Sequence, residues 1–154
     1  MLIVNRCLPL IFGLHRAHDP LTNCPRGCLE RETPEHAFLE CPAVQSLWDS
    51  LLPRISALWR LPPITNIMLL LVKPDEVLSR LSLEAQQQAV FVLNCVVRHI
   101  WRTRTSLSSA RPLSSPQALL ATFEAALLQD LVIAKTFDVS FECWQAALRP
   151  LYSG

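Results

Sequence analysis

Three cysteines and one histidine near the beginning of the chain have the residue types and the spacing of a metal site. They follow the pattern Cys-x3-Cys-x7-His-x4-Cys and are Cys24, Cys28, His36 and Cys41. Zn²⁺ binds thiolate sulfur and imidazole nitrogen in tetrahedral geometry, and three cysteines with one histidine form one of its usual structural sets. Four protein ligands leave no coordination position open for water or a substrate. The pattern therefore predicts a structural zinc site.

The residues between these ligands favour a compact loop. A Pro-Arg-Gly segment separates the first two cysteines, and Gly27 can adopt the positive φ angle that a tight turn requires. We expect His36 and Cys41, five residues apart, to come from a short helical turn and its end. His15 and His18 lie upstream of the pattern and are the alternative histidine ligands.

Two other interpretations of the cysteines fit less well. Cysteines that only fill a core behave as small apolar side chains, whereas the first two of the four lie among Asn, Pro, Arg and Gly. A disulfide framework needs an oxidising compartment, and residues 1–19 lack the small-x-small cleavage pattern of a secretory signal peptide. We therefore expect an intracellular protein, cytoplasmic or nuclear, whose cysteines bind metal.

Further residues around the ligands follow the pattern of a known family. In chain order they are Cys24-Pro25-Arg26-Gly27-Cys28, Glu32-Thr33-Pro34-Glu35-His36, Cys41-Pro42 and Trp48. Over residues 20–50 the chain resembles the zinc-binding domain that follows the polymerase in LINE-type (non-LTR) retrotransposon reverse transcriptases. Ile100-Trp101-x-x-Arg104 is similar to a helix that often follows in this family. The resemblance implies a zinc-stabilised module that binds nucleic acid and carries no polymerase.

Hydrophobic periodicity predicts that the rest of the chain is mostly helical. The expected helices are, in chain order, one from Pro42 that Pro53 interrupts, one over 83–105 with Ser82 as its N-cap, one over 116–134 and one over 140–148. The apolar run 67–72 is compatible with a strand or a buried helix. We expect a mostly α fold in which a small Cys3His zinc knuckle packs on a helical bundle, with Trp48 covering the knuckle.

The chain divides into three expected parts. Residues 1–19 resemble the tail of a polymerase thumb, residues 20–60 form the zinc knuckle and the helix that follows, and residues 61–154 form a helical C-terminal region. We expect the knuckle and the C-terminal region to make one compact unit. Residues 106–115, rich in Ser, Pro and Arg, are expected to be an exposed loop.

Basic residues gather in the second half of the chain. Between Arg80 and Arg111 there are five arginines and one acidic residue, although the net charge of the whole chain is only +1. Arg98, Arg102 and Arg104 are therefore candidate contacts to an RNA or DNA backbone, with the choice between RNA and DNA left open. A solvated helix face explains the same residues equally well.

The zinc knuckle itself is a poor anion site. Three thiolates around Zn²⁺ leave a formal charge of −1, and several glutamates surround the pattern. Any contact to nucleic acid from this region would come from nearby arginines such as Arg26 and Arg31. Trp101 lies on the apolar stripe of the 83–105 helix, so we expect it in the core rather than stacked on a base.

The sequence offers little for catalysis. A polymerase palm needs carboxylates that hold two metal ions, and the chain has no adjacent pair of aspartates. Three scattered glycines cannot build a phosphate-binding loop. Cys95 and His99 have the spacing of a nucleophile and its base, but the apolar neighbours of Cys95 predict a buried, unreactive thiol. We expect no enzyme activity.

A second class of function fits the composition. With half of its residues apolar and a near-neutral charge, the chain is also compatible with a helical protein-interaction scaffold or an inactive retrotransposon remnant whose zinc only stabilises the fold. The exposed surface would then pack on the missing polymerase domain or on a second copy. No unbroken apolar run approaches the length of a membrane-spanning helix, so we expect no membrane contact.

Overall fold

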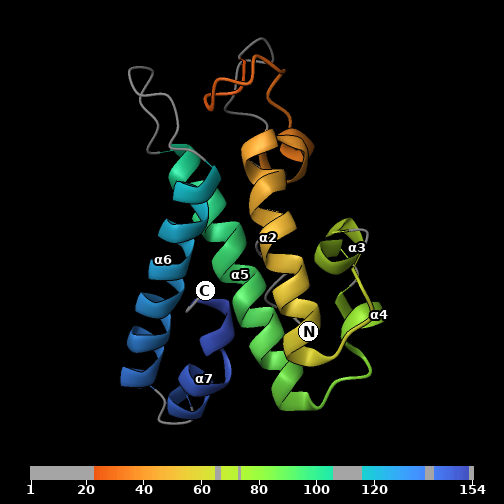
Figure 1. The fold of residues 1–154 in the computed structure, drawn as a ribbon, viewed down its shortest axis with the longest axis vertical. Helices are drawn as coiled ribbons and strands as arrows, with labels where there is room; N and C mark the ends of the chain where they lie inside the picture. The colour runs from red at the N-terminus through yellow and green to blue at the C-terminus, as the bar shows by residue number, and fades with distance from the viewer. Residues whose placement is uncertain (1–22, 65–66, 73, 106–115, 138–140, 153–154) are drawn as a thin grey trace.

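The computed structural model describes residues 23–64, 67–72, 74–105, 116–137 and 141–152, and these are mostly helical. In chain order the elements are the π-helical turn η2 (His36–Glu40), α2 (Pro42–Trp59), α3 (Ile67–Val72), α4 (Pro74–Leu78), α5 (Leu83–Thr105), α6 (Pro116–Phe137), α7 (Phe141–Ala147) and the 3-10 turn η3 (Arg149–Leu151). The loop and turn that carry the Cys3His cluster lie beside the start of α2 and the end of α5 (Figure 1). The expected fold class is confirmed.

Helix α2 begins with Pro42 in its first turn, as expected, because a proline has no N–H to lose there. The prediction that Pro53 interrupts this helix is wrong, since α2 continues unbroken to Trp59. Leu51 and Ile55 are buried on either side of the exposed Pro53. Packing of one continuous apolar face therefore offsets the hydrogen bond that an interior proline removes, a cost of about 3 kcal/mol.

The chain turns sharply at the end of α2 before the next helix begins at Ile67. Arg60 adopts a left-handed conformation with φ 52°, and the N–H of the buried Leu61 donates to the carbonyl of Ser56 at 2.9 Å. This is the hydrogen bond of a Schellman C-cap. The apolar run Ile67–Val72, whose sequence is compatible with either a strand or a helix, forms helix α3.

The later helices lie where their apolar periodicity predicts them. Helix α5 has the expected bounds, and the hydroxyl of Ser82 accepts a hydrogen bond from the Ala85 N–H at 3.3 Å, as an N-cap does. Helix α6 continues to Phe137, three residues beyond the expected end at Ala134. A short 3-10 turn follows α7 and buries Leu151.

Helix α6 is the central packing element of the bundle. It packs against both α2 and α5, and α7 packs on it in turn; the three long helices run along the long axis of the molecule (Figure 1). The fully buried side chains on these helices include Leu47, Leu51 and Ile55 of α2, Val92, Val96 and Ile100 of α5, and Leu119, Phe123 and Leu127 of α6. Arg54 of α2 and Glu124 of α6 form an ion pair at 2.6 Å at the edge of this core.

By length and composition, one stretch among the described residues would be able to cross a bilayer, Gln117–Thr136 in α6, with a mean hydropathy of 1.4. This stretch is not an unbroken apolar run, because Glu124 and Asp130 interrupt it. The length and composition of a single helix do not establish a span, and this helix buries the stripe through Phe123 and Leu127 inside the bundle.

Several sequence predictions concern residues outside the described ranges. These are the 1–19 lead-in, the alternative ligands His15 and His18, and the exposed loop over 106–115.

Candidate metal centre

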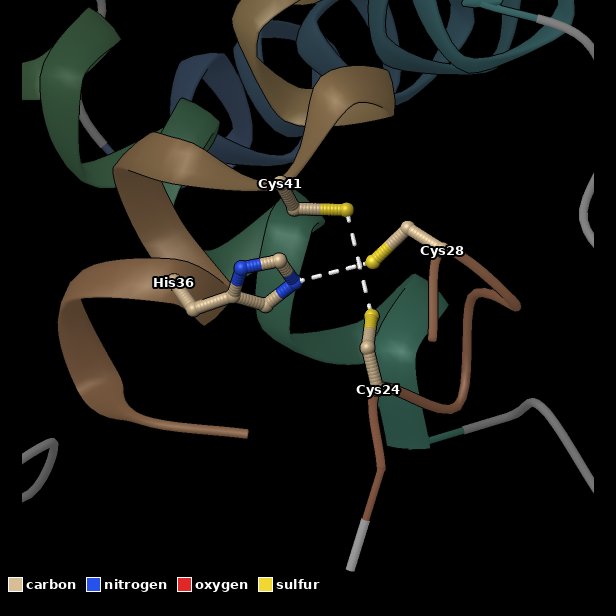
Figure 2. Close-up of side chains that lie close together, drawn as sticks. All are labelled: Cys24, Cys28, His36 and Cys41. Carbon is tan, nitrogen blue, oxygen red and sulfur yellow. Dashed lines mark hydrogen bonds between the residues drawn. The ribbon is translucent and has the colours of Figure 1, made fainter. Parts of the chain in front are cut away.

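The four predicted ligands converge on a common point (Figure 2). Their ligand atoms, three cysteine Sγ atoms and a ring nitrogen of His36, all lie within 4.8 Å of one another. The Sγ atoms of Cys24 and Cys41 are 3.9 Å apart, and Cys28 Sγ lies 3.1 Å from His36 Nε2. The structure thus brings together every residue that the spacing selected for the metal.

These distances can be compared with those around a tetrahedral ion. Two sulfurs bound to one Zn²⁺ at about 2.3 Å lie about 3.8 Å apart, and a bound sulfur and nitrogen lie about 3.5 Å apart. The Cys24–Cys41 separation matches the first value, and the Cys28–His36 separation is a few tenths of an ångström shorter than the second. Both the donor set and the distances are compatible with zinc.

The first two ligands are held by a tight loop. The Gly27 N–H donates to the Cys24 carbonyl at 3.0 Å, and the Cys24 N–H donates to the Glu30 carbonyl at 2.8 Å, which closes the loop on itself. Gly27 has φ 79°, the positive angle expected for it. Leu29 also has a positive φ, 67°, and its side chain is 80% exposed. Burial of Leu29 therefore does not stabilise this loop. Its backbone hydrogen bonds hold it, and they position the two cysteines.

The other two ligands come from one wide helical turn and its end, as expected. The Cys41 N–H donates to the His36 carbonyl at 2.8 Å, five residues back, which is the hydrogen bond of a π-helix. The His36 N–H donates to the Thr33 hydroxyl at 3.0 Å, so Thr33 satisfies a backbone donor at the start of the turn. The π-turn sets the relative positions of His36 and Cys41.

Burial disfavours charged thiolates in the cluster when no cation is bound to them. Cys24, His36 and Cys41 are buried and Cys28 is half-buried. Burial, with smaller contributions from Cys28 and Cys41, raises the pKa of the Cys24 thiol to about 12. A thiol in this environment keeps its proton near neutral pH unless a metal ion replaces it. The arrangement therefore suits an ion with high affinity for thiolate.

Aromatic side chains join the knuckle to the bundle. The Trp48 indole N–H of α2 donates to the Phe38 carbonyl in η2 at 2.9 Å, and Trp48 is buried. The Phe38 ring stacks on Trp101 of α5 with the centroids 6.2 Å apart. Trp48 thus covers the knuckle as expected, and Trp101 packs against it as a partly buried side chain.

Arg26 points into the protein, so it is not among the nearby arginines from which a contact to nucleic acid would come. Only 7% of its surface is exposed, and its two terminal nitrogens donate to the Ala37 carbonyl at 3.2 Å and the Ile100 carbonyl at 2.7 Å. Burial lowers the pKa of Arg26, whereas Cys41 and Cys24 oppose that shift. Its positive charge therefore lies beside the ligands that become negative when they bind a metal. Arg31 is exposed, so its contact to nucleic acid stays a prediction.

Arg104 is also buried, which contradicts its predicted role in backbone contact. It forms an ion pair with Glu32 of the knuckle loop, and the two side chains are only 8% and 6% exposed. Its guanidinium carbon lies 5.1 Å from the centre of the Trp101 ring. Arg104 therefore fixes the loop to the end of α5 and is not available to a phosphate backbone.

Arg98 and Arg102 face the same way, as their spacing predicts. Both line one cleft of about 300 Å³ between α5 and α6, together with His99, Gln129 and Asp130 among others. Arg98 forms an ion pair with Asp130, and the two side chains are 53% and 20% exposed. The structure thus separates these two exposed arginines from the buried Arg104.

Cys95 and His99 lie at the floor of this cleft. Both are buried, as expected for Cys95, and burial raises the pKa of its thiol to about 12. Burial also lowers the pKa of His99, whose Nε2 lies 3.2 Å from the Thr122 hydroxyl. A thiol with this pKa is protonated near neutral pH and is a poor nucleophile.

The acidic partners of Arg104 and Arg98 were not predicted from the sequence. Glu32 pairs with a residue 72 positions away, and Asp130 pairs with one 32 positions away. No spacing or periodicity reports a contact over such distances. Glu32 was visible only as part of a family pattern, and Asp130 carried no signal.

Comparison of the chain with protein-family models, curated proteins and solved structures gave no match. The resemblance to the zinc-binding domain of LINE-type reverse transcriptases therefore rests on the residues of the sequence.

Proposed function

We propose that the chain is a zinc-stabilised helical module that binds nucleic acid, of the kind that follows the polymerase in LINE-type reverse transcriptases. The observation that carries this proposal is the convergence of Cys24, Cys28, His36 and Cys41 within 4.8 Å. The family pattern requires these four side chains to meet, although they are spread over two separate pieces of backbone. In this proposal Zn²⁺ is structural and the module is not catalytic.

Metal analysis tests the first half of the proposal. Purified wild-type protein should contain one zinc per chain, and Cys28→Ser should contain much less. Cys143→Ser is the matched control, because Cys143 is exposed and lies outside the cluster. Wild-type protein that folds fully without metal would contradict a structural zinc.

Two exposed arginines support the second half. Arg98 and Arg102 line the same cleft, and a guanidinium group can donate two parallel hydrogen bonds to a phosphate. Contacts of this kind release counterions, so affinity should fall steeply as salt rises.

Fluorescence anisotropy with short single-stranded RNA and DNA at several salt concentrations tests this. The double variant Arg98→Gln, Arg102→Gln should bind more weakly and reduce the salt slope by about two. Arg80→Gln, which removes an exposed arginine outside the cleft, is the control. Absence of binding to either nucleic acid at low salt would overturn the proposal, and the difference between the two probes would identify the preferred one.

A helical interaction scaffold is the second candidate function. Helix α6 exposes 36% of Leu128 and 48% of both Val132 and Ile133. Exposed apolar clusters often mark surfaces that bind another protein. Light scattering should then show self-association that Val132→Lys weakens. Self-association without any effect of nucleic acid would favour the scaffold.

A further inference from the structure

We infer that the cleft between α5 and α6 holds one phosphate group, and that Asp130 is a built-in competitor for it. If the phosphate group belongs to a nucleic-acid backbone, this inference rests on the proposed function. If it belongs to a free phosphate compound, the inference is independent of that function. Both sources present the same chemistry, a tetrahedral oxyanion.

The donors of the cleft come from two helices. Arg98 and Arg102 lie one turn apart on α5, and Gln129 adds an amide from α6. Guanidinium groups offer planar donors that fit phosphate oxygens, and a neutral amide can complete the coordination. With two arginines and one aspartate, the charged lining has a net charge of +1.

The floor of the cleft adds no charge. His99 and Cys95 are buried there, and both are uncharged near neutral pH because burial disfavours their ionised forms. The charged groups are therefore confined to the rim. A cleft of about 300 Å³ with a neutral floor and a basic rim has room for a phosphate group and places the donors for it at the rim.

Asp130 shows where an oxyanion can bind. Its carboxylate pairs with Arg98, so an acidic oxygen already occupies a position against that guanidinium. The Arg98 side chain is 53% exposed, and ion pairs this open to solvent are weak. A free phosphate carries more negative charge than one carboxylate, and a phosphodiester with the same charge can contact both arginines at once. Either would therefore displace Asp130 from Arg98.

The test removes the competitor without changing the shape of the cleft. Asp130→Asn should tighten binding by about two- to fivefold, the range expected when an exposed ion pair no longer has to be broken. Asp49→Asn is the matched control, since Asp49 is an exposed residue of α2 and the substitution changes the net charge equally. In an Arg98→Gln background, the Asp130→Asn gain should disappear.

Two probes are titrated into each variant: inorganic phosphate, followed by NMR of the arginine side chains, and a short single-stranded oligonucleotide, followed by anisotropy. If phosphate binds and Asp130→Asn tightens it while the oligonucleotide does not bind, the phosphate site stands and the nucleic-acid function fails. If the oligonucleotide binds but Asp130→Asn and Asp49→Asn behave alike, the site is wrong and the function stands. If neither probe binds, both are overturned.

Discussion

The knuckle and the α5–α6 cleft use arginine in opposite ways. At the knuckle, Arg26 and Arg104 are 7% and 8% exposed and bind backbone carbonyls and a buried glutamate. At the cleft, Arg98 and Arg102 are exposed, and the acidic partner of Arg98 is itself partly open to solvent. The first pair joins the knuckle loop to the bundle, and the second pair lines the cleft at the surface.

This difference shows that position in the chain is a poor guide to the role of an arginine. Arg102 and Arg104 are two residues apart on the same helix, but about 200° apart around its axis. Arg102 therefore points into the cleft, whereas Arg104 points toward the knuckle loop and pairs with Glu32. Substitutions at the knuckle should lower stability, and substitutions at the cleft should lower binding.

Removal of the metal should have the largest effect. Zinc binding and folding are coupled in sites of this kind and can contribute on the order of 10 kcal/mol. Chelation should therefore abolish hydrogen-exchange protection in residues 24–41 and weaken the core around Trp48. Addition of zinc should restore both. If the knuckle kept its hydrogen-exchange protection without metal, this prediction would be contradicted, because Arg26 and Arg104 would then suffice to hold the loop.

Loss of the buried ion pair should come next. Arg104→Leu leaves Glu32 buried without a partner, which typically costs about 3–5 kcal/mol. Urea unfolding of the zinc-loaded protein measures this, and the double variant with Glu32→Leu should recover a large part of the loss. The neighbouring Arg102→Leu is the control and should change the unfolding free energy by less than about 1 kcal/mol. Equal losses at the two positions would contradict the division of roles.

Arg26 should have a smaller effect on stability. Arg26→Met keeps most of the side-chain volume but removes the donors to the carbonyls of Ala37 and Ile100. Each hydrogen bond from a charged group contributes about 1.5–3 kcal/mol. Methionine also removes the cost of burying a charge, so the net loss of unfolding free energy should be about that of one such bond. Thermal unfolding with zinc in excess measures the change. Arg31→Met, which removes an exposed arginine of the same loop, should leave the melting temperature nearly unchanged.

The smallest effect concerns the cleft and appears only in acid. Burial, together with the charges of Arg102 and Arg26, lowers the pKa of His99 below its usual 6.5, against the Leu119 carbonyl and Asp130, which raise it. As pH falls below about 6.5, the unfolded chain binds this proton more readily than the folded one, so the unfolding free energy decreases.

His99→Gln should remove that part of the acid sensitivity. The comparison is urea unfolding of both proteins at about pH 7 and about pH 5.5. Any release of zinc from the knuckle in acid would affect both proteins, so the difference between them isolates His99. The same loss in both proteins would show that His99 does not titrate differently on folding.

The local features of the site were accessible from the sequence. The spacing of the four ligands, the positive φ of Gly27 and the helical turn at His36 each depend on a few neighbouring residues, and the structure confirms them. The same holds for α5, whose apolar periodicity and N-cap define its bounds. Pro53 was expected to interrupt α2 because an interior proline removes a backbone hydrogen bond. The helix continues because packing along the whole of α2 outweighs that local cost.

What the sequence by itself determined is therefore the candidate metal ligand set and the helices, because both are encoded in short-range spacing. The tertiary structure alone decided which arginines are buried and which are exposed. Arg26 and Arg104 can be buried because acceptors from distant parts of the chain, the Ile100 carbonyl and Glu32, accept hydrogen bonds from their guanidinium groups. Burying a charge without such partners costs far more than leaving it in water, and only the folded chain brings those partners within reach.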